Sequence, residues 1–332
     1  MLDNEPRNNI RFISSGCYIP NTLVTNEEIA QKVGSSDTWI QEHTGIQTRY
    51  IADKGEAASD LGYKAALHAI QKSRIDKDSI QMLITATSTP DHLSFPATSC
   101  IIQKKLNISE AMAFDITAAC SGFTYAASLA IDALHAGSID TALVIGSEVF
   151  SSIINWNDRN TCILFGDGAG AVLLSTRFEG TSRILARHMI SEPTEYKSLY
   201  RPAGGSATRD IPYTEEECFV SMNGKKVYQL VLNLCVQTIE VIVQKSGITL
   251  NDIDLLIPHQ ANLKMLQNAA KRIQFPIEKI VLNLDTYANT SAASIPIAIA
   301  EAEANGRLER GMKVLLIGFG AGLTCGAILL EW

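Results

Sequence analysis

Cys120 lies where an apolar segment gives way to a helix, a position that suits a nucleophile. The surrounding stretch, 113–128, has the pattern of a buried strand, a tight turn and an alanine-rich helix. A thiolate at a helix N-terminus is stabilised by unpaired backbone N–H groups and by the positive end of the helix dipole. The common alternative is a buried cysteine that packs as a small hydrophobic residue. This stretch alone leaves both interpretations open.

Two more polar residues follow predicted strands in the second half of the chain. His259 lies after the apolar segment 252–257, and Asn289 precedes an alanine-rich helix. In open α/β sheets, functional groups gather at the carboxyl ends of strands, where Cys120 also lies. Taken alone, His259 is interpreted as a hydrogen-bonded structural histidine, and Asn289 is interpreted as a helix N-cap. Together the three residues predict a Cys-His-Asn site.

The segments that position these residues recur at a nearly constant spacing of about 170 residues, which indicates an internal duplication. The matching pairs are 79–84 with 252–257, 115–120 with 283–289, and 141–146 with 313–318. Their strands are apolar throughout, as is typical of parallel strands that helices cover on both faces. We therefore expect an α/β protein with two βαβ-type halves, 1–178 and 179–332.

The remaining periodicity predicts the individual elements. The sequence from Thr25 to Glu28 is a capping box that opens a short helix. Predicted strands cover 9–17, 80–87, 113–117 and 141–146, another follows the turn at 165–170, and a helix covers 98–106. A second helix is expected at 57–74. Its expected core-facing residues are Leu61, Ala65, His68 and Ala69.

Two segments need a separate interpretation. Residues 314–330 carry no charge, but glycines interrupt them, so we predict two strands around a glycine-rich turn rather than a membrane span. Residues 191–217 are polar and rich in proline and glycine. They predict a surface excursion that can cover a site.

Composition restricts the class of protein. The 332 residues are 46% apolar and 19% charged, as in a globular protein, and their net charge of −7 argues against general nucleic-acid binding. The seven cysteines are scattered without zinc-binding spacing, so no metal is expected. The N-terminus has no apolar signal segment, and together with the cysteine pattern this predicts a cytoplasmic protein without a membrane association.

Four motifs together resemble the β-ketoacyl-acyl-carrier-protein synthase III family. They are AACSGFTYA at 118–126, FGDGAGA at 165–171, PHQAN at 258–262 and NTSAAS at 289–294. The resemblance covers essentially the whole chain. It implies the thiolase-like fold, with layers in the order α-β-α-β-α. It also implies a homodimeric condensing enzyme that starts fatty-acid synthesis.

The resemblance assigns a role to each member of the trio. Cys120 would accept the acyl group of a thioester, because a thiolate is a soft nucleophile. His259 and Asn289 would donate hydrogen bonds to the enolate oxygen that forms when a malonyl thioester loses carbon dioxide. The backbone N–H groups of Cys120 and Ala321 would form a second oxyanion hole. The family often has glycine at the position of Ala321. Alanine tolerates a positive φ poorly, so the expected role of Ala321 requires a negative φ.

The resemblance also places an acyl-coenzyme A substrate, with no permanently bound cofactor. Trp39 and Arg159 would hold the adenine, although Asn160 replaces the usual glycine after Arg159. His43 stands where the family commonly has an arginine, and histidine is mostly neutral and cannot make a forked contact. The donor is therefore either a weakly held coenzyme A thioester or an acyl group on a protein. The resemblance adds Met222 and Asn262 to this substrate site.

Two further sites are implied. Phe95 would close the acyl pocket across a dimer interface and favour a short acyl group, whereas its alternative is core packing. Lys264, Lys271 and Arg272 would bind acyl carrier protein through a basic helix face, although such charges are usually just solvated. Lys264 replaces an arginine of the family.

Other functions stay open at this point. The same trio can serve an acyltransferase or condensing enzyme of secondary metabolism, or a cysteine hydrolase that uses His259 as a base. A non-catalytic subunit of a condensing complex is also conceivable, but such subunits typically lose the nucleophile that Cys120 provides here.

Overall fold

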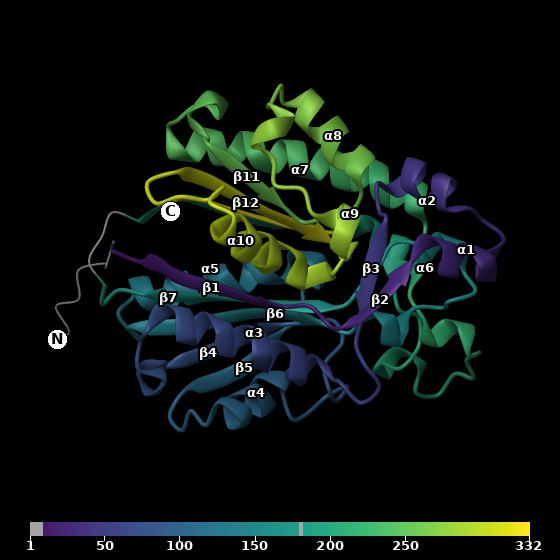
Figure 1. Cartoon of the computed structure of the whole chain (residues 1–332), viewed down its shortest axis with the longest axis horizontal. Helices are drawn as coiled ribbons and strands as arrows, with labels where there is room; N and C mark the ends of the chain where they lie inside the picture. The colour runs from purple at the N-terminus through teal and green to yellow at the C-terminus, as the bar shows by residue number, and fades with distance from the viewer. Residues whose placement is uncertain (1–8, 179–181) are drawn as a thin grey trace.

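The computed structural model describes residues 9–178 and 182–332, which form two main sheets (Figure 1). The first sheet has the strand order β1-β7-β6-β4-β5, and the second has the order β11-β12-β13-β8. The strands of the first are β1 (Arg11–Tyr18), β4 (Met82–Ala86), β5 (Met112–Ile116), β6 (Thr141–Glu148) and β7 (Gly168–Ser175). Those of the second are β8 (Arg183–Ser191), β11 (Leu255–Pro258), β12 (Lys313–Gly320) and β13 (Thr324–Glu331). The boundary predicted after residue 178 borders residues 179–181, which lie outside the described residues.

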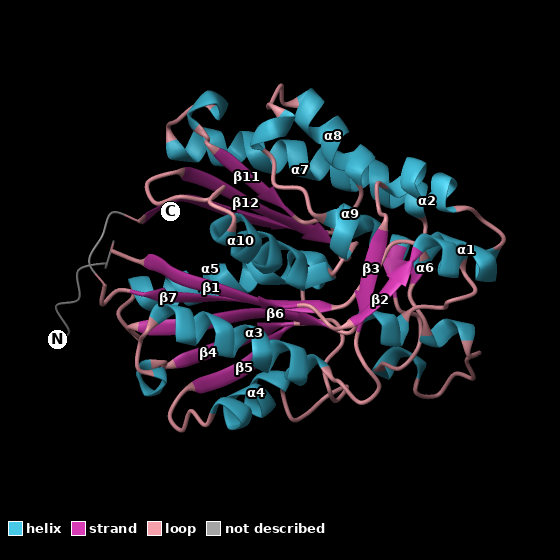
Figure 2. Ribbon diagram, in the orientation of Figure 1, coloured by secondary structure: helices cyan, strands magenta, loops and turns pink. Residues whose placement is uncertain are grey.

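Helices form three layers around these sheets, as Figure 2 shows. Helices α5 (Gly122–His135) and α10 (Ser294–Ala304) lie between the sheets, and their apolar residues share one core with both. Helices α3 (Ala58–Ser73) and α4 (Thr98–Leu106) cover the outer face of the first sheet. Helices α7 (Gly224–Ser246) and α8 (Leu263–Arg272) cover that of the second. The predicted α-β-α-β-α order is confirmed.

The two sheets differ by one strand. In the first sheet, β4 pairs in parallel with both β5 and β6, whereas β11 pairs in parallel with β12 alone. The counterpart of β5 is reduced to one bridge between Leu256 and Ile280. The Gln260 side chain lies at this place, where its amide donates to the Val281 carbonyl (3.0 Å) and accepts from the Asn283 N–H (3.1 Å). This side chain takes hydrogen bonds that a strand ladder would otherwise use.

Most local predictions are confirmed. Helix α1 (Asn26–Val33) begins with the expected capping box, in which Thr25 and Glu28 satisfy each other's backbone N–H groups. Helix α4 has its predicted bounds. His68 is an error, because it is exposed on α3 and its Nδ1 contacts the backbone of Cys17 at 3.4 Å. Helical periodicity placed it at the edge of the apolar face, which ends at Ala65 and Ala69.

The glycine-rich segment near the C-terminus forms the two predicted strands, β12 and β13. Among the described residues, α7 is a helix whose length and apolar composition would allow it to cross a membrane. Its buried residues, including Leu234 and Ile239, pack against the second sheet instead. Its composition therefore matches its place in the protein core.

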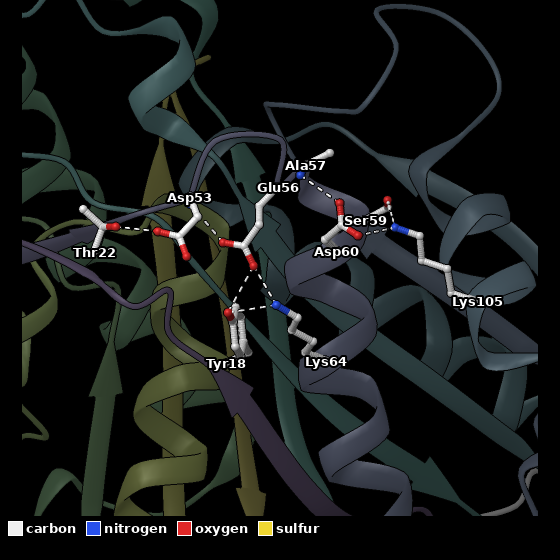
Figure 3. A network of polar contacts seen from close by, with 9 residues as sticks. All are labelled: Tyr18, Thr22, Asp53, Glu56, Ala57, Ser59, Asp60, Lys64 and Lys105. Carbon is white, nitrogen blue, oxygen red and sulfur yellow. Dashed lines mark hydrogen bonds and ion pairs between the residues drawn. The ribbon is translucent and has the colours of Figure 1, made fainter.

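A polar network joins β1, the loop before α3, and α4 at the surface (Figure 3). Glu56 accepts hydrogen bonds from the Tyr18 hydroxyl (3.1 Å) and from Lys64 Nζ (2.6 Å). These contacts hold the pKa of Glu56 below its usual range although its burial acts against this. Lys105 extends the network by an ion pair with Asp60 (2.6 Å). The network fixes the ends of α3 and α4 without contributing to the cavity described below.

Candidate active site

Cys120, His259 and Asn289 line one cavity of about 530 Å³, although they come from distant parts of the chain. Cys120 lies in the short helix η2 (Ala119–Ser121) ahead of α5, and His259 directly follows β11. Asn289 follows the short helix α9 (Leu284–Tyr287). The three residues are 6%, 2% and 6% exposed, respectively. The structure thus brings the predicted trio into one pocket, where all three side chains are largely buried.

Glycines of β12 determine where Cys120 lies. A Cβ atom at Gly320 would lie 2.7 Å from the Cys120 backbone nitrogen, and one at Gly318 would lie 3.0 Å from the Ser121 Cα. Any side chain there would therefore push the turn outward. Ala119 has a positive φ of 46°, which turns the chain sharply before Cys120. The sequence shows the glycines, but only the structure shows what they contact.

Burial dominates the electrostatics of Cys120. It raises the pKa of the thiol to about 12, and the carboxylate of Glu148 acts in the same direction. A hydrogen bond with the Ser291 hydroxyl and the backbone N–H of Cys120 lower this pKa in part. Burial thus opposes the thiolate stabilisation expected from the helix terminus, and the resting group is a thiol. The proton must leave as the sulfur attacks.

His259 is held as a neutral donor. Its backbone N–H donates to the Ile317 carbonyl (2.8 Å), which extends the pairing of β11 with β12. Its ring Nδ1 lies 2.7 Å from the Ser294 hydroxyl, and burial lowers its pKa to about 3. A neutral ring whose Nδ1 accepts from Ser294 carries its proton on Nε2. That nitrogen can donate to a developing oxyanion.

Asn289 connects the two halves of the molecule. Its backbone N–H donates to the Leu164 carbonyl (2.9 Å), and its carbonyl accepts from the Gly166 N–H (3.1 Å). Its side-chain Oδ1 accepts from the Ser291 N–H (2.9 Å). Because Oδ1 is occupied, the amide NH₂ group is the part of the side chain that can donate to a substrate. The turn-forming role and the donor role are compatible here.

The backbone at Ala321 has the negative φ that its expected role requires. Ala321 and Gly320 line the cavity with Cys120. Ala321 is not among the described residues that have a positive φ. Alanine therefore fits this place without the strain that a left-handed conformation would impose.

Aromatic and charged groups stack at the outer end of the cavity. Trp39 and His43 lie on α2 (Asp37–Thr44), and their rings stack with centroids 4.0 Å apart. Arg159, at the start of α6 (Arg159–Cys162), lies 4.8 Å from the Trp39 ring centroid. The Asn262 side chain caps α8 and donates to the His43 carbonyl (2.9 Å). Asn160 and Met222, the latter on β10 (Ser221–Met222), also line the cavity.

The structure does not bring Phe95 or the basic residues into this cavity. Phe95 is 83% exposed, so its alternative as a core residue is wrong. Lys264, Lys271 and Arg272 are exposed on α8, and Arg272 Nη1 donates to Asn233 Oδ1 on α7 (2.7 Å). The basic residues therefore lie on the outer layer.

Sequence reasoning missed part of the lining. The polar segment 191–217 contributes Leu199, Tyr200 and Arg201 to the cavity wall, and Leu199 and Tyr200 form the strand β9. Strand β9 pairs with β10, which carries Met222. The composition of this segment predicted a cover but gave no signal for these three residues. Glu148 and Ser291 were also missed, because they act on Cys120 only through the fold.

Comparisons with known proteins agree on one family. Family models described as 3-oxoacyl-[acyl-carrier-protein (ACP)] synthase III and its C-terminal part match residues 114–193 and 243–332. A β-ketoacyl-[acyl-carrier-protein] synthase III from Clostridium acetobutylicum is 40% identical over 98% of this chain and 99% of its own length. One from Paramagnetospirillum magneticum is 42% identical over 97% and 98%.

Solved structures give the same result. The 3-oxoacyl-[acyl-carrier-protein] synthase III of Aquifex aeolicus has a TM-score of 0.90 and 36% identity, with 97% of this chain and 100% of that chain covered. The priming β-ketosynthase of the R1128 polyketide pathway has a TM-score of 0.91 and 28% identity, covering 99% and 98%.

Proposed function

The chain belongs to the β-ketoacyl-acyl-carrier-protein synthase III family, and on that premise we propose that it condenses a short acyl thioester with malonyl-acyl carrier protein. The product is a β-ketoacyl-acyl carrier protein, and carbon dioxide is released. The observation that carries the proposal is the convergence of Cys120, His259 and Asn289 on one cavity. The chain is thus an acyltransferase of the condensing type.

The geometry supports a division of labour. Cys120 takes the acyl group, and the backbone N–H groups of Cys120 and Ala321 serve the tetrahedral states at its carbonyl carbon. His259 and Asn289 donate to the enolate oxygen of the malonyl group. A histidine with a pKa of about 3 stays neutral throughout, so it donates a hydrogen bond rather than a proton. The enolate carbon then attacks the acyl-cysteine.

Coenzyme A enters this scheme as a substrate and not as a bound cofactor. The stack of Arg159, Trp39 and His43 is the feature that supports an adenine at the mouth of the cavity. The Arg159 guanidinium already contacts the Trp39 ring, so an entering base must displace it. Because the imidazole of His43 cannot make the forked contact of an arginine, we propose that the nucleotide is held weakly.

Replacing His43 by arginine is expected to strengthen binding of coenzyme A thioesters. A permanently charged, forked side chain can pair with a phosphate, which at an exposed site adds about 1 kcal/mol, or roughly fivefold in KM. The measurement compares KM for acetyl-coenzyme A with that for acetyl-pantetheine, which lacks the nucleotide. His68→Arg, which adds the same charge on α3, is the control. An equal change for both donors would contradict a nucleotide contact.

An acidic carrier protein suits the outer face of α8. Lys264 and Lys271 are exposed there, seven positions apart on one face of the helix, while the whole protein is acidic. A local basic surface on an acidic protein favours an acidic partner in one orientation. We propose that acyl carrier protein docks there, close to His43 and Asn262 at the cavity mouth.

A homodimer is supported by the exposed edge of the first sheet. Strand β5 is the edge strand, and its residues are exposed or half-buried, whereas β4, β6 and β7 are fully buried. Met112, on β5, is 53% exposed, and Leu93 and Phe95 are 71% and 83% exposed. We propose that a second copy covers these residues and places Phe95 at its acyl pocket. A monomeric sedimentation coefficient at micromolar concentration would refute this.

Intact-protein mass spectrometry tests the proposed function. We expect a mass gain with acetyl-coenzyme A that requires Cys120, and discharge as a β-ketoacyl product when malonyl-acyl carrier protein is added. Cys120→Ala is the control. A mass gain only with longer or aromatic acyl groups would favour a specialised condensing enzyme of secondary metabolism. The similarity to the priming β-ketosynthase of the R1128 polyketide pathway supports that alternative. Discharge to water would instead indicate a hydrolase.

We also propose a cytoplasmic location, which rests on the cysteine pattern.

A further inference from the structure

Glu148 is a buried carboxyl group behind the nucleophile that the steps above leave without a role. It ends β6 and is 0% exposed. Its oxygens accept hydrogen bonds from the Thr89 hydroxyl (2.8 Å) and from the Ser88 N–H (3.0 Å). Longer contacts come from the Thr87 hydroxyl and the Ala292 N–H, both at 3.4 Å. Such a set of donors suits a carboxylate, which can only accept.

Ser291 connects this carboxyl group with Cys120. Its hydroxyl donates to Glu148 Oε1 at 3.0 Å, and the same side chain lies close enough to Cys120 to lower the pKa of that thiol. Ser291 has a positive φ of 49°, an uncommon conformation for serine, and its N–H is held by Asn289 Oδ1. The backbone therefore holds one hydroxyl between the nucleophile and a buried base.

Close packing places Ser291 there. The short helix η9 (Ser291–Ala293) lies directly on β6, because a Cβ atom at Gly146 would be 2.3 Å from the Ala292 carbonyl oxygen. On its other side η9 lies near Gly122 of α5, where an added Cβ would be 3.6 Å from the Ala292 Cβ. The connection from Glu148 through Ser291 to Cys120 is therefore held by the core of the molecule.

Among the described residues, the groups that contact Glu148 carry no charge at rest. The groups that face it are the hydroxyls of Thr87, Thr89 and Ser291, the backbone N–H groups of residues 88 and 292, and the thiol of Cys120. Burial raises the pKa of Glu148 to about 7, against the effect of these hydrogen bonds. The carboxyl group therefore changes from neutral to ionised within the range in which enzymes work.

We propose that Glu148 is a positioning residue that accepts the proton of Cys120 through Ser291 during acylation. This rests on the proposed function. As Cys120 Sγ attacks the thioester carbon, its proton passes to Ser291 Oγ, and the Ser291 proton passes to Glu148 Oε1. The bond from carbon to the sulfur of the donor breaks. The Cys120 sulfur is now acylated and takes no proton, so Ser291 Oγ donates instead to the released donor thiolate and regains a proton from Glu148 Oε1. The step therefore needs no other reactant.

A purely electrostatic role for Glu148 predicts the opposite result. A negative charge near Cys120 raises the pKa of its thiol, so removing that charge would increase the thiolate fraction and speed acylation. Loss of a proton acceptor slows acylation instead. The sign of the change in Glu148→Gln therefore separates the two roles.

The experiment measures single-turnover acylation by acetyl-coenzyme A between pH 5.5 and 9, by intact-protein mass spectrometry. In the wild type we expect the rate to rise with pH through about 7, as Glu148 ionises, and then to level off. Glu148→Gln and Ser291→Ala should acylate about 10²-fold more slowly, and their acylation rate should no longer rise with pH through this range. Condensation from a preformed acyl-enzyme should change much less, because His259 and Asn289 are untouched.

Thr89→Val provides the matched control. It removes a hydrogen bond that lowers the pKa of Glu148 and leaves Ser291 and Cys120 unchanged. The rise of the acylation rate should therefore move to higher pH, and the maximal rate should be retained. Wild-type acylation by Glu148→Gln at every pH would overturn the proposal, and so would an equal loss in Thr89→Val and Ser291→Ala. If Glu148→Gln does not fold, Ser291→Ala decides alone. A wild type that never acylates would refute the proposed function instead.

Discussion

Alanine at His259 or at Asn289 is expected to slow condensation by about 10²- to 10³-fold, and alanine at His259 is expected to leave acylation of Cys120 intact. Both side chains are held as donors by contacts on their far side, His259 by Ser294 and Asn289 by the Ser291 N–H. Each donor gains strength only when charge develops on the enolate oxygen, so its loss affects the decarboxylating step. The measurement follows acyl-enzyme formation and its discharge by malonyl-acyl carrier protein separately.

Asn289→Asp is the matched variant for this experiment. Aspartate preserves the shape and the contact with Ser291, but its second oxygen faces the enolate without a proton to donate. We therefore expect a larger loss of condensation for Asn289→Asp than for Asn289→Ala. If a folded His259→Ala variant fails to acylate, His259 is instead the base that takes the proton of Cys120, and the division of labour proposed above is wrong.

Gly320→Ala is expected to reduce acylation by about 10²-fold, since a displacement of roughly 1 Å at a reacting group has such an effect. The added Cβ would lie 2.7 Å from the Cys120 nitrogen and 3.0 Å from the Cys120 Cβ. Neither atom belongs to a flexible chain end, so the turn that carries the nucleophile must shift. Overpacking of this kind also costs about 1–3 kcal/mol of stability.

Single-turnover acylation and thermal unfolding check this prediction together. Gly205→Ala is the control, because a Cβ atom at Gly205 meets nothing within 4 Å and its φ of −106° suits alanine. Gly320→Ala should lose acylation before it loses its fold. A variant that acylates at the wild-type rate would show that the turn at Cys120 can move away from β12 without harm.

Much of the site was predictable because two of its members follow strand ends, although Asn289 follows the short helix α9 and not the expected strand. Cys120 and His259 each come after an apolar strand, and the duplicated spacing placed Asn289 at the position that corresponds to Cys120. The strand ends are short-range patterns, and short-range patterns determine helices, strands and caps. The capping box at Thr25 and Glu28 was predictable for the same reason, since every atom involved lies within one turn.

Such patterns could not predict contacts between side chains that are far apart in the sequence. Nothing near Gln260 in the sequence indicates that its amide makes hydrogen bonds with backbone groups where the second sheet lacks a strand. The contact of Arg159 with the Trp39 ring depends on α2 and α6 meeting at the cavity mouth. The exposure of Phe95 depends on which edge of the first sheet stays uncovered.

The sequence by itself determined the trio, the layered α/β fold and the family, because residue order and spacing carry that information. Only the tertiary structure decided how the trio is held. Glu148 and Ser291 are 143 positions apart, yet a hydrogen bond of 3.0 Å joins them beside Cys120. That contact exists because glycines at 146, 318 and 320 let the short helices of both halves pack against strands. Burial in this shared core then makes the thiol, the imidazole and the carboxyl group differ from their behaviour in water.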